Sequence, residues 1–229
     1  MKHLLSIDRS AGLGSWALYR DSDKLADGTF QAGLPRTPTW YADVLAGLSS
    51  AGVEPTAIDE MLVGTGPGSF SGIRAVIAAL QGLSMVKDLP VLGLTSAAAA
   101  ARAAALREQA EHVAVVGDAR RGTYWMCRYD IDSDGKVTLA STGKAPAHLL
   151  GDFSLLKIDE VAPAIPAGTL IVTPEYAKLR GLLENIPETR LLEGDAIPTA
   201  SELADLYFSN PPAAIRDPLP VYLHPAVVG

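Results

Sequence analysis

The stretch from Met61 to Lys87 constrains the fold most strongly, because it runs from a strand through a glycine-rich loop into a long apolar helix. Met61 to Val63 has the composition expected at the end of a buried strand. Ser69 or Ser71 is placed to cap the helix that follows the loop. Three glycines of the loop are free to adopt positive φ angles: Gly64, Gly66 and Gly68.

The helix after this loop carries one bulky apolar face. Its large aliphatic side chains recur at steps of three and four residues, so they line one side of a helix. They are Ile73, Val76, Ile77, Leu80, Leu83 and Val86. Small residues lie between them, at Ala75, Ala78, Ala79 and Gly82. This combination predicts a helix that another helix can approach closely.

The glycine loop matches neither common phosphate-binding fingerprint. No Gly-Lys-Ser/Thr follows it, which excludes a Walker A motif, and glycines at 64, 66, 68 and 72 lack the dinucleotide-binding spacing. Two interpretations remain. Free N–H groups at the helix start hold an anion, or the loop is a tight turn that lets the helix dock on the sheet. Spacing alone favours the turn.

Capping residues mark three further helices. Thr39 can cap a helix from Trp40 to about Ser50, after a chain break at 35–38. Ser96 can cap the alanine-rich helix at 97–105, whose composition strongly favours helix. Thr199 or Ser201 can cap a helix at 201–209.

The opening pattern of the chain returns in its second half. The strand Leu4 to Ile7 ends on Asp8 and a glycine turn, and two further strands follow; Val113 to Val116 begins the same series and ends on Asp118. A repeated βββ opening, followed by helices and more strands, predicts two similar α/β lobes. We place the lobes at 1–108 and 109–229, with room for the tail to pack back on the first lobe.

Asp8 and Asp118 occupy matching positions in this duplication. In two-lobed phosphotransfer folds such turns face a nucleotide between the lobes, and an aspartate there can hold Mg²⁺ through water. The simpler alternative, an Asx-turn acceptor, suits either residue alone better. Their pairing in both halves is consistent with a nucleotide cleft. Its candidate nucleotide- or anion-binding residues are Asp8, Ser10, Gly66, Gly68, Ser69, Asp118 and Arg120.

The composition describes a soluble chain with a substantial core. Hydrophobic residues make up 48% and charged residues 20% of its 229 residues, which argues against disorder. The net charge of −7 gives no general attraction to nucleic acid or membrane, so any RNA contact needs a local basic patch or a basic partner. No apolar run reaches the roughly 18 residues of a membrane span, and no signal-peptide pattern opens the chain. We expect a cytoplasmic protein.

Metal and nucleophile chemistry find little support in the sequence. The single cysteine, Cys127, excludes an internal disulfide and a four-thiolate zinc site within one chain. The four histidines are scattered, and no Gly-x-Ser-x-Gly elbow is present. We therefore predict no catalytic residue and no metal site. Arg120-Arg121 could meet a phosphate, but an arginine pair is usually a solvated turn.

The nine residues from Gly66 to Arg74 resemble the Gly-Pro-Gly-Ser-Phe-Thr-Gly-Leu/Val-Arg signature of the TsaB (YeaZ) family. Three further segments, in the same order, resemble its Ile-Asp-Thr-Ser, its Asp-Ala-Arg-x-Gly and its closing Pro-x-Tyr-Leu-Arg: 7–10, 118–122 and 220–224. Arg9 and Ser71 replace threonine, and His224 replaces arginine. Arg9 places a bulky cation in the first-lobe turn, which argues against nucleotide contacts there.

The resemblance implies an actin-like, two-lobed ASKHA fold and a role in making threonylcarbamoyladenosine in tRNA. Family members are degenerate relatives of the catalytic subunit TsaD and act with it, and with the ATPase TsaE, on adenosine 37 of tRNAs that read ANN codons. TsaD holds its metal through a His-x-x-x-His on its first long helix, whereas residues 36–41 here contain no histidine. The resemblance therefore implies a non-catalytic scaffold without its own cofactor. Its partners would bind most of the ATP and Mg²⁺, and tRNA would be contacted indirectly.

In the family, the first helix and the helix after the glycine loop, here about 39–50 and 72–87, form a bundle with TsaD, or a homodimer when TsaD is absent. The interface residues that this predicts are Tyr41, Leu45, Leu48, Ile73, Val76, Ile77, Ala79, Leu80 and Leu83. Two other functions stay open. One is an autonomous actin-like kinase or ATPase, and the other is a metallopeptidase-like protein, which the lack of clustered metal ligands disfavours.

Overall fold

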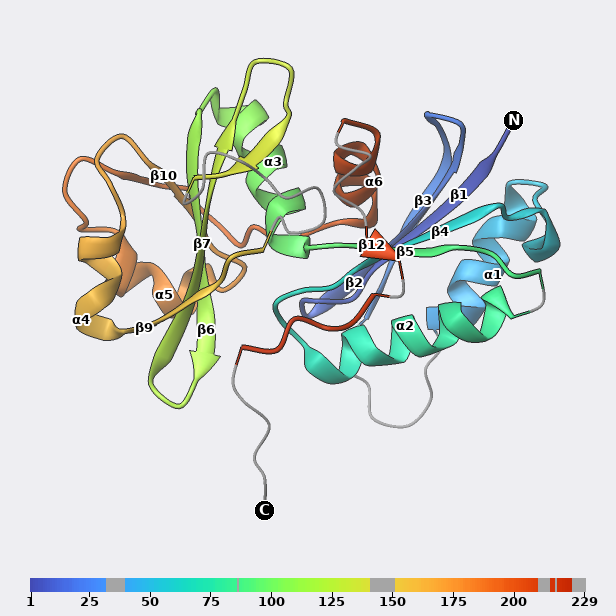
Figure 1. Ribbon diagram of the computed structural model, residues 1–229, viewed down its shortest axis with the longest axis horizontal. Helices are drawn as coiled ribbons and strands as arrows, with labels where there is room; N and C mark the ends of the chain where they lie inside the picture. Colours follow the sequence, from blue (N-terminus) through green and yellow to red (C-terminus); the bar gives the residue numbers. More distant parts are fainter. Residues whose placement is uncertain (32–39, 86, 141–150, 210–214, 217, 224–229) are drawn as a thin grey trace.

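The computed structural model describes residues 1–31, 40–85, 87–140, 151–209, 215–216 and 218–223. These residues form two mixed β-sheets, each with its own helices (Figure 1). Within these ranges, no helix has both the length and the apolar character needed to cross a membrane. The break predicted at 35–38, the cap predicted at Thr39 and the tail residue His224 lie outside the described residues.

The first lobe begins with an antiparallel hairpin and continues with parallel strands. Its sheet has the order β12-β5-β4-β1-β2-β3, in which β1 pairs antiparallel with β2 and parallel with β4. The elements are β1 (His3–Asp8), β2 (Leu13–Arg20), β3 (Asp23–Gln31), α1 (Trp40–Ser50), β4 (Glu60–Gly64), α2 (Phe70–Ser84), β5 (Val91–Leu94) and α3 (Ser96–Glu108).

The second lobe repeats this topology. Its sheet has the order β11-β10-β6-β7-β8. When the strands of each lobe are counted along the chain without β9 and β12, both sheets have the same order: third, second, first, fourth, fifth. The extra strand β9 pairs with β7. The elements are β6 (His112–Arg120), β7 (Thr123–Ile131), β8 (Val137–Leu139), β9 (Ser154–Lys157), α4 (Ile158–Val161), β10 (Leu170–Val172), α5 (Tyr176–Leu183) and β11 (Arg190–Leu191). The predicted α/β fold with duplicated lobes is confirmed.

The C-terminal part of the chain returns to the first lobe. β12 (Ile215–Arg216) adds to the first sheet beside β5, and α6 (Ala200–Ser209) packs on β1, β2 and β4. Two hydrogen bonds join the start of α6 to this sheet: Ser6 Oγ donates to the Ala200 carbonyl at 2.8 Å, and the Ala200 N–H donates to Ser15 Oγ at 2.8 Å.

The helices and sheets stack in layers. α3 and α6 share one apolar core with the facing sides of both sheets, so they lie between the lobes (Figure 1). α1 and α2 cover the outer face of the first sheet, and α4 and α5 cover the outer face of the second. Both faces of the central strands are therefore buried, which explains why Val113 to Val116 is a continuous apolar run and why Ser6 is the one polar residue in Leu4 to Ile7.

The bulky stripe of α2 faces its own sheet and not a partner. Its aliphatic side chains from Ile73 to Leu83 pack with β1 and β4 in the outer core of the first lobe, and Val86 lies outside the described residues. Five predicted interface residues are at most 5% exposed: Leu48, Ile73, Val76, Ile77 and Leu80. The structure places them in the core of the first lobe, where burying each such side chain against the sheet contributes about 1.5–3 kcal/mol.

The predicted caps have mixed outcomes. Thr199 caps α6 in a capping box with Glu202, whose N–H donates to Thr199 Oγ1 at 3.2 Å. Ser69 stands at the N-cap of α2, but its hydroxyl makes no capping hydrogen bond. Thr95 rather than Ser96 is the N-cap residue of α3. The prediction for Ser96 was wrong because its hydroxyl bonds to Asp8 instead.

Several short elements were not predicted. β9, α4, β11 and β12 have two to four residues each, and such short segments carry no readable periodicity. α2 also ends at Ser84, with Met85 as its C-cap residue, instead of continuing to Lys87.

Candidate functional site

A cleft of about 670 Å³ lies between the two lobes. It is bounded by the turns after β1 and β6, the glycine loop, the start of α2, α3 and the last described segment. Five of the seven predicted nucleotide- or anion-binding residues line it: Ser10, Gly68, Ser69, Asp118 and Arg120. Asp8 and Gly66 lie behind this lining and do not face the cleft.

Asp8 is a buried hydrogen-bond acceptor that joins three segments of the first lobe. Its Oδ1 accepts from the Ser10 N–H at 2.8 Å and from the Ser10 hydroxyl at 2.7 Å, and its Oδ2 accepts from the Ser96 hydroxyl at 2.5 Å. The carboxyl group is fully buried, and this burial raises its pKa even though these hydrogen bonds act in the opposite direction. The Asx-turn interpretation is confirmed for Asp8.

Ser96 carries the same network into the glycine loop. The Gly66 N–H donates to Ser96 Oγ at 3.1 Å, and the Ser96 N–H donates to the Gly66 carbonyl at 2.9 Å. A Cβ at Gly64 would lie 1.8 Å from Asp8 Oδ2, so only glycine fits beside the carboxyl group. Gly64 and Gly66 therefore serve the packing of β4, the loop and α3 against Asp8.

The cleft side of the loop is fixed by backbone contacts with the turn after β1. The Ser69 N–H donates to the Ser10 carbonyl at 2.7 Å. A Cβ at Gly68 would lie 2.0 Å from the same carbonyl oxygen, so a larger residue would push the two loops apart. The loop thus acts as the docking turn that the spacing favoured, and it leaves Gly68 and Ser69 exposed to the cleft.

Asp118 occupies the equivalent position in the second lobe and is held by cations. Its Oδ1 accepts from the Arg120 N–H at 2.8 Å, the same two-residue Asx geometry as at Asp8. Its Oδ2 bonds to Lys178 and lies 3.1 Å from Arg120 Nη1. Burial alone would raise the pKa of Asp118, but the hydrogen bonds and charges of Lys178 and Arg120 together lower it.

The opposite pKa directions predict opposite pH effects on stability. The lowered pKa of Asp118 means that its contribution is present above the ordinary aspartate value and is lost as the pH falls through the folded-state pKa. The raised pKa of Asp8 means that stability falls as the pH rises from the ordinary value through its folded-state pKa. We expect Asp118→Asn to flatten the acid end of a stability profile from about pH 2 to about pH 6, measured by thermal unfolding. Because Lys178 and Arg120 are largely exposed, the loss should stay below about 1 kcal/mol.

The turn after β6 presents two arginines in a strained backbone conformation. Arg120, Arg121 and Gly122 have consecutive positive φ angles of 68°, 55° and 73°. A hairpin turn of this kind normally takes asparagine or glycine, and the left-handed region costs a non-glycine residue about 1–2 kcal/mol. The sequence placed Arg120 at the cleft but gave no reason to place Arg121 there, whereas the structure has both.

The cleft residues that sequence reasoning missed include aromatic and charged side chains beside small and apolar ones. Phe70 and Tyr222 stand at the mouth, and Glu175 accepts from the Asp118 N–H at 2.9 Å. Within the described part of the chain, no group of three or more His, Cys, Asp or Glu side chains is arranged to hold a metal ion. Besides its two carboxylates, the cleft has arginines, hydroxyls and aromatic rings, which suit binding of an anionic or planar ligand.

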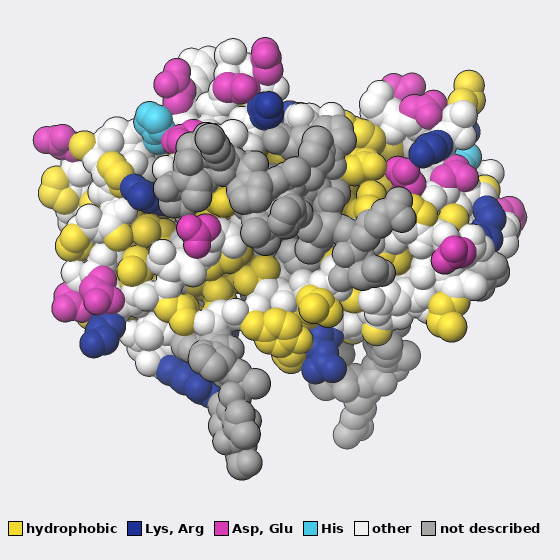
Figure 2. Space-filling model, in the orientation of Figure 1, with side chains coloured by type: hydrophobic (Ala, Val, Ile, Leu, Met, Phe, Trp, Pro, Cys, Tyr) yellow, Lys and Arg dark blue, Asp and Glu magenta, His cyan; other side chains and the backbone are white. Residues whose placement is uncertain are grey.

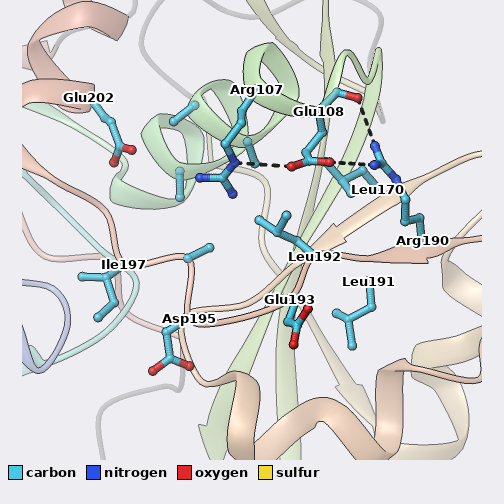
Figure 3. A pocket seen from close by; sticks show the side chains of 14 residues that line it. Arg107, Glu108, Leu170, Arg190, Leu191, Leu192, Glu193, Asp195, Ile197 and Glu202 are labelled. Atoms are coloured by element: carbon cyan, nitrogen blue, oxygen red, sulfur yellow. Dashed lines mark hydrogen bonds and ion pairs between the residues drawn. The ribbon is translucent and has the colours of Figure 1, made fainter.

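A second cavity of about 470 Å³ lies on another side of α3 and was not predicted (Figure 3). Along its upper edge Glu108 bridges two arginines, with Arg190 Nη1 at 2.6 Å from Oε2 and Arg107 Nε at 3.4 Å from Oε1. Glu202 faces it from α6, and burial raises the pKa of that carboxyl group. Because Glu108 is bound to both arginines and Glu202 caps its own helix, we assign these side chains to packing between the lobes.

The other predicted interface residues lie at the surface between α1 and α2. Tyr41, Leu45, Ala79 and Leu83 are partly buried, and all except Ala79 line an apolar hollow of about 80 Å³. The outward face of α2 is made by different residues. Its exposed positions include the small residues Ser71, Ala75, Ala78 and Gly82, flanked by the longer Arg74, Gln81 and Met85, and Met85 is 85% exposed.

The repeated strand order and the cleft between the lobes define the class of protein. It is a two-lobed α/β protein with the actin-like ASKHA fold. A family model described as TsaD, tRNA N6-adenosine threonylcarbamoyltransferase, matches residues 44–163, just over half of the chain.

Curated relatives and solved structures agree with this class. The tRNA threonylcarbamoyladenosine biosynthesis protein TsaB of Escherichia coli K12 is 30% identical over 137 residues, 58% of this chain and 57% of the relative. TsaB of Haemophilus influenzae is 40% identical over 73 residues, 32% of this chain and 31% of the relative. The matches thus span about half, or less, of these curated relatives.

The similarity to solved structures extends over nearly the whole chain. A crystal structure of a Pseudomonas aeruginosa protein with similarity to peptidase YeaZ superposes with a TM-score of 0.78 and 26% identity, covering 98% of this chain and 100% of the other. YeaZ from Pseudomonas aeruginosa superposes with a TM-score of 0.77 and 26% identity, covering 97% and 100%. The chain belongs to the family that the TsaD model describes, and the TsaB relatives and YeaZ structures confirm the resemblance to TsaB (YeaZ) seen in the glycine loop.

Proposed function

We propose that this chain is a non-catalytic subunit for threonylcarbamoyl transfer to adenosine 37 of tRNAs that read ANN codons, acting with a TsaD-type catalytic subunit and a TsaE-type ATPase. The names of the curated TsaB relatives and the matching TsaD family model support a role in this modification. The observation that carries the subunit role is the outward face of α2, which exposes small side chains beside an apolar hollow.

The partner surface in this proposal combines α1 and α2. Ala75, Ala78 and Gly82 have short or absent side chains, so a partner helix could approach to the 8–10 Å interaxial distance of packed helices. Tyr41, Leu45 and Leu83 offer apolar surface at the edge of this face. In isolation the same surface would join two copies of the chain.

The two aspartates at matching positions of the lobes also support a non-catalytic role. Asp8 is buried with three hydrogen-bond donors, and Asp118 is bound to Lys178 and Arg120. Neither carboxylate is free in this arrangement to orient Mg²⁺ or to take up a proton from a substrate. We therefore propose that the chain needs no cofactor of its own, that partners bind most of the ATP and Mg²⁺, and that it works in the cytoplasm with tRNA.

An actin-like kinase or ATPase is the second candidate, because the main cleft lies between the lobes and contains Ser10, Ser69 and Arg120. Calorimetry with ATP and Mg²⁺ on the isolated chain distinguishes the two. The subunit proposal predicts no turnover by the isolated chain, whereas tight binding with turnover contradicts it.

The proposal as a whole is tested by co-purification and reconstitution. We expect the chain to co-purify with the TsaD homologue of its own cell. We also expect the modification of a tRNA reading an ANN codon to require the chain when it is reconstituted from purified components. Full modification without the chain would overturn the proposal. A preparation of the catalytic subunit with the chain added back is the matched control.

A further inference from the structure

Two exposed aromatic rings meet at the mouth of the cleft. Phe70, the first residue of α2, is 43% exposed, and Tyr222 in the last described segment is 62% exposed. Their ring centroids lie 5.3 Å apart with the planes at 61°, and the Arg74 guanidinium lies 5.1 Å from the Phe70 centroid. We call Phe70, Tyr222 and Arg74 the aromatic platform. Figure 2 shows hydrophobic side chains beside a cationic one at the lower edge of the molecule, near the start of α2.

The platform is held in place by the first sheet. The Val221 N–H donates to the Thr65 carbonyl at 2.9 Å, and Pro218 packs against Gly93 of β5. Pro218 and Pro220 are buried, whereas Leu219 and Tyr222 point outward. The backbone that precedes Tyr222 is therefore held on the first sheet, and the exposed ring has a defined position.

Arginines face the platform from the other lobe. Arg120 and Arg121 line the same cleft as Phe70 and Tyr222, and the tip of the β6–β7 hairpin lies on the same side of the molecule as the start of α2 (Figure 1). Arg120 pairs with Asp118, whereas Arg121 has no ion-pair partner among the described residues. The strained turn thus places one neutralised and one free guanidinium at the cleft.

Two cations at the cleft mouth have no carboxylate partner among the described residues. The lining itself carries two arginines, Arg120 and Arg121, and two carboxylates, Asp118 and Glu175. Arg120 and Lys178 pair with these carboxylates. Arg121 and Arg74, which lies over the Phe70 ring, therefore supply the local positive charge that contact with RNA requires in a chain of net charge −7.

Exposed rings next to arginines form the surface that single-stranded nucleic acid uses. Unpaired bases stack on aromatic side chains and on guanidinium planes, and the neighbouring phosphates bind cations. We infer that the cleft mouth binds unpaired RNA nucleotides, with a base on the aromatic platform and an adjacent phosphate at Arg120 and Arg121. This inference rests on the proposed function, which supplies an RNA partner, and it adds a direct contact to a role in which tRNA contact was expected to be indirect.

Fluorescence anisotropy with the full chain and a labelled RNA hairpin tests the inference. The hairpin carries a loop of about seven unpaired nucleotides, and a fully paired duplex of similar length is the comparison. We expect the hairpin to bind more tightly than the duplex, and Phe70→Ala and Tyr222→Ala each to weaken hairpin binding by about 5-fold or more. Arg121→Ala should weaken binding. It should also reduce the slope of the logarithm of the binding constant against the logarithm of the salt concentration by about one.

The controls separate stacking from general surface effects. Tyr222→Phe keeps the ring and should bind like the wild type, and Leu219→Ala removes an exposed apolar side chain from the same segment outside the cleft. Equal binding of hairpin and duplex, no detectable hairpin binding at low salt, or unchanged affinity in both ring-to-alanine variants would overturn the inference. Competition by AMP as strong as by the hairpin would also overturn it, in favour of a mononucleotide site.

Failure of this inference can be told from failure of the proposed function. If the ring-to-alanine variants lose capture of the TsaD homologue but keep RNA binding, the platform is a protein contact and the inference fails while the subunit role stands. If the modification proceeds fully without the chain, the proposed function fails whatever the RNA affinity is. The inference is supported only when hairpin affinity falls while capture of the catalytic subunit is retained.

Discussion

Asp8→Ala is expected to lower the free energy of unfolding by about 2–5 kcal/mol. The substitution removes the acceptor for three buried donors, the Ser10 N–H, the Ser10 hydroxyl and the Ser96 hydroxyl. Each donor that is left without a partner costs about 1–3 kcal/mol, partly offset because a fully buried carboxylate is no longer desolvated. For a chain of this size we expect a melting temperature lower by roughly 5–15 °C in a thermal unfolding experiment.

The duplicated fold supplies the control for this prediction. Asp118→Ala removes the equivalent Asx acceptor in the second lobe, but its partners Lys178 and Arg120 can turn to solvent, so the loss should stay below about 1 kcal/mol. Asp8→Asn should fall between the two, because the amide oxygen still accepts from Ser10 while Ser96 loses its acceptor. Equal losses at Asp8 and Asp118 would contradict the assignment of Asp8 to a buried network.

The topology could be predicted because its signals are local and repeated. Apolar runs that end on an aspartate and a turn opened both halves, and the structure has the same Asx hydrogen bond of 2.8 Å after β1 and after β6. The glycine loop also followed from local signals, since three glycines before an apolar helix favour a docking turn. The α/β class and the two lobes therefore followed from the order of elements alone.

The sequence could not predict which side chains of this chain contact each other, because these contacts join residues that are distant in sequence. Asp8 and Ser96 are 88 residues apart, so nothing near Ser96 in the sequence argued against its predicted role as a helix cap. The aromatic platform likewise joins Phe70 to Tyr222, two residues that are far apart in the sequence. Sequence spacing identifies which residues share a helix face, but only the tertiary fold decides what covers that face.

α2 shows this limit most clearly. Both faces of this helix suit packing: one carries large aliphatic side chains, and the other carries small side chains that let a neighbouring helix approach. Burial of Ile73, Val76 and Leu80 on the sheet gains more than burial of alanines, so the bulky face turned inward. The face available to a partner is therefore the small-residue face, which the sequence had treated as spacing between interface residues.

Ala78→Arg is accordingly expected to weaken homodimerisation or binding of the catalytic subunit at least 10-fold, which is about 1.4 kcal/mol, without lowering the stability of the chain. Ala78 is exposed, and its methyl group lets a partner backbone approach. A guanidinium at this position must either hold the partner helix away or be desolvated beneath it. Analytical ultracentrifugation measures the dimer, titration with the catalytic subunit measures the heterodimer, and thermal unfolding checks the fold.

Two matched variants decide whether the outward face of α2 is the binding surface. Leu106→Arg adds the same charge to an exposed position on α3, so it should leave both affinities unchanged. Leu80→Ala should do the reverse of Ala78→Arg: it opens a cavity under α2 and costs about 2–5 kcal/mol of stability while leaving the outward face intact. If Leu80→Ala weakens binding under conditions where it is still folded and Ala78→Arg does not, the binding surface lies elsewhere. If only Ala78→Arg weakens it, the core and partner faces of α2 are separate, as their exposure indicates.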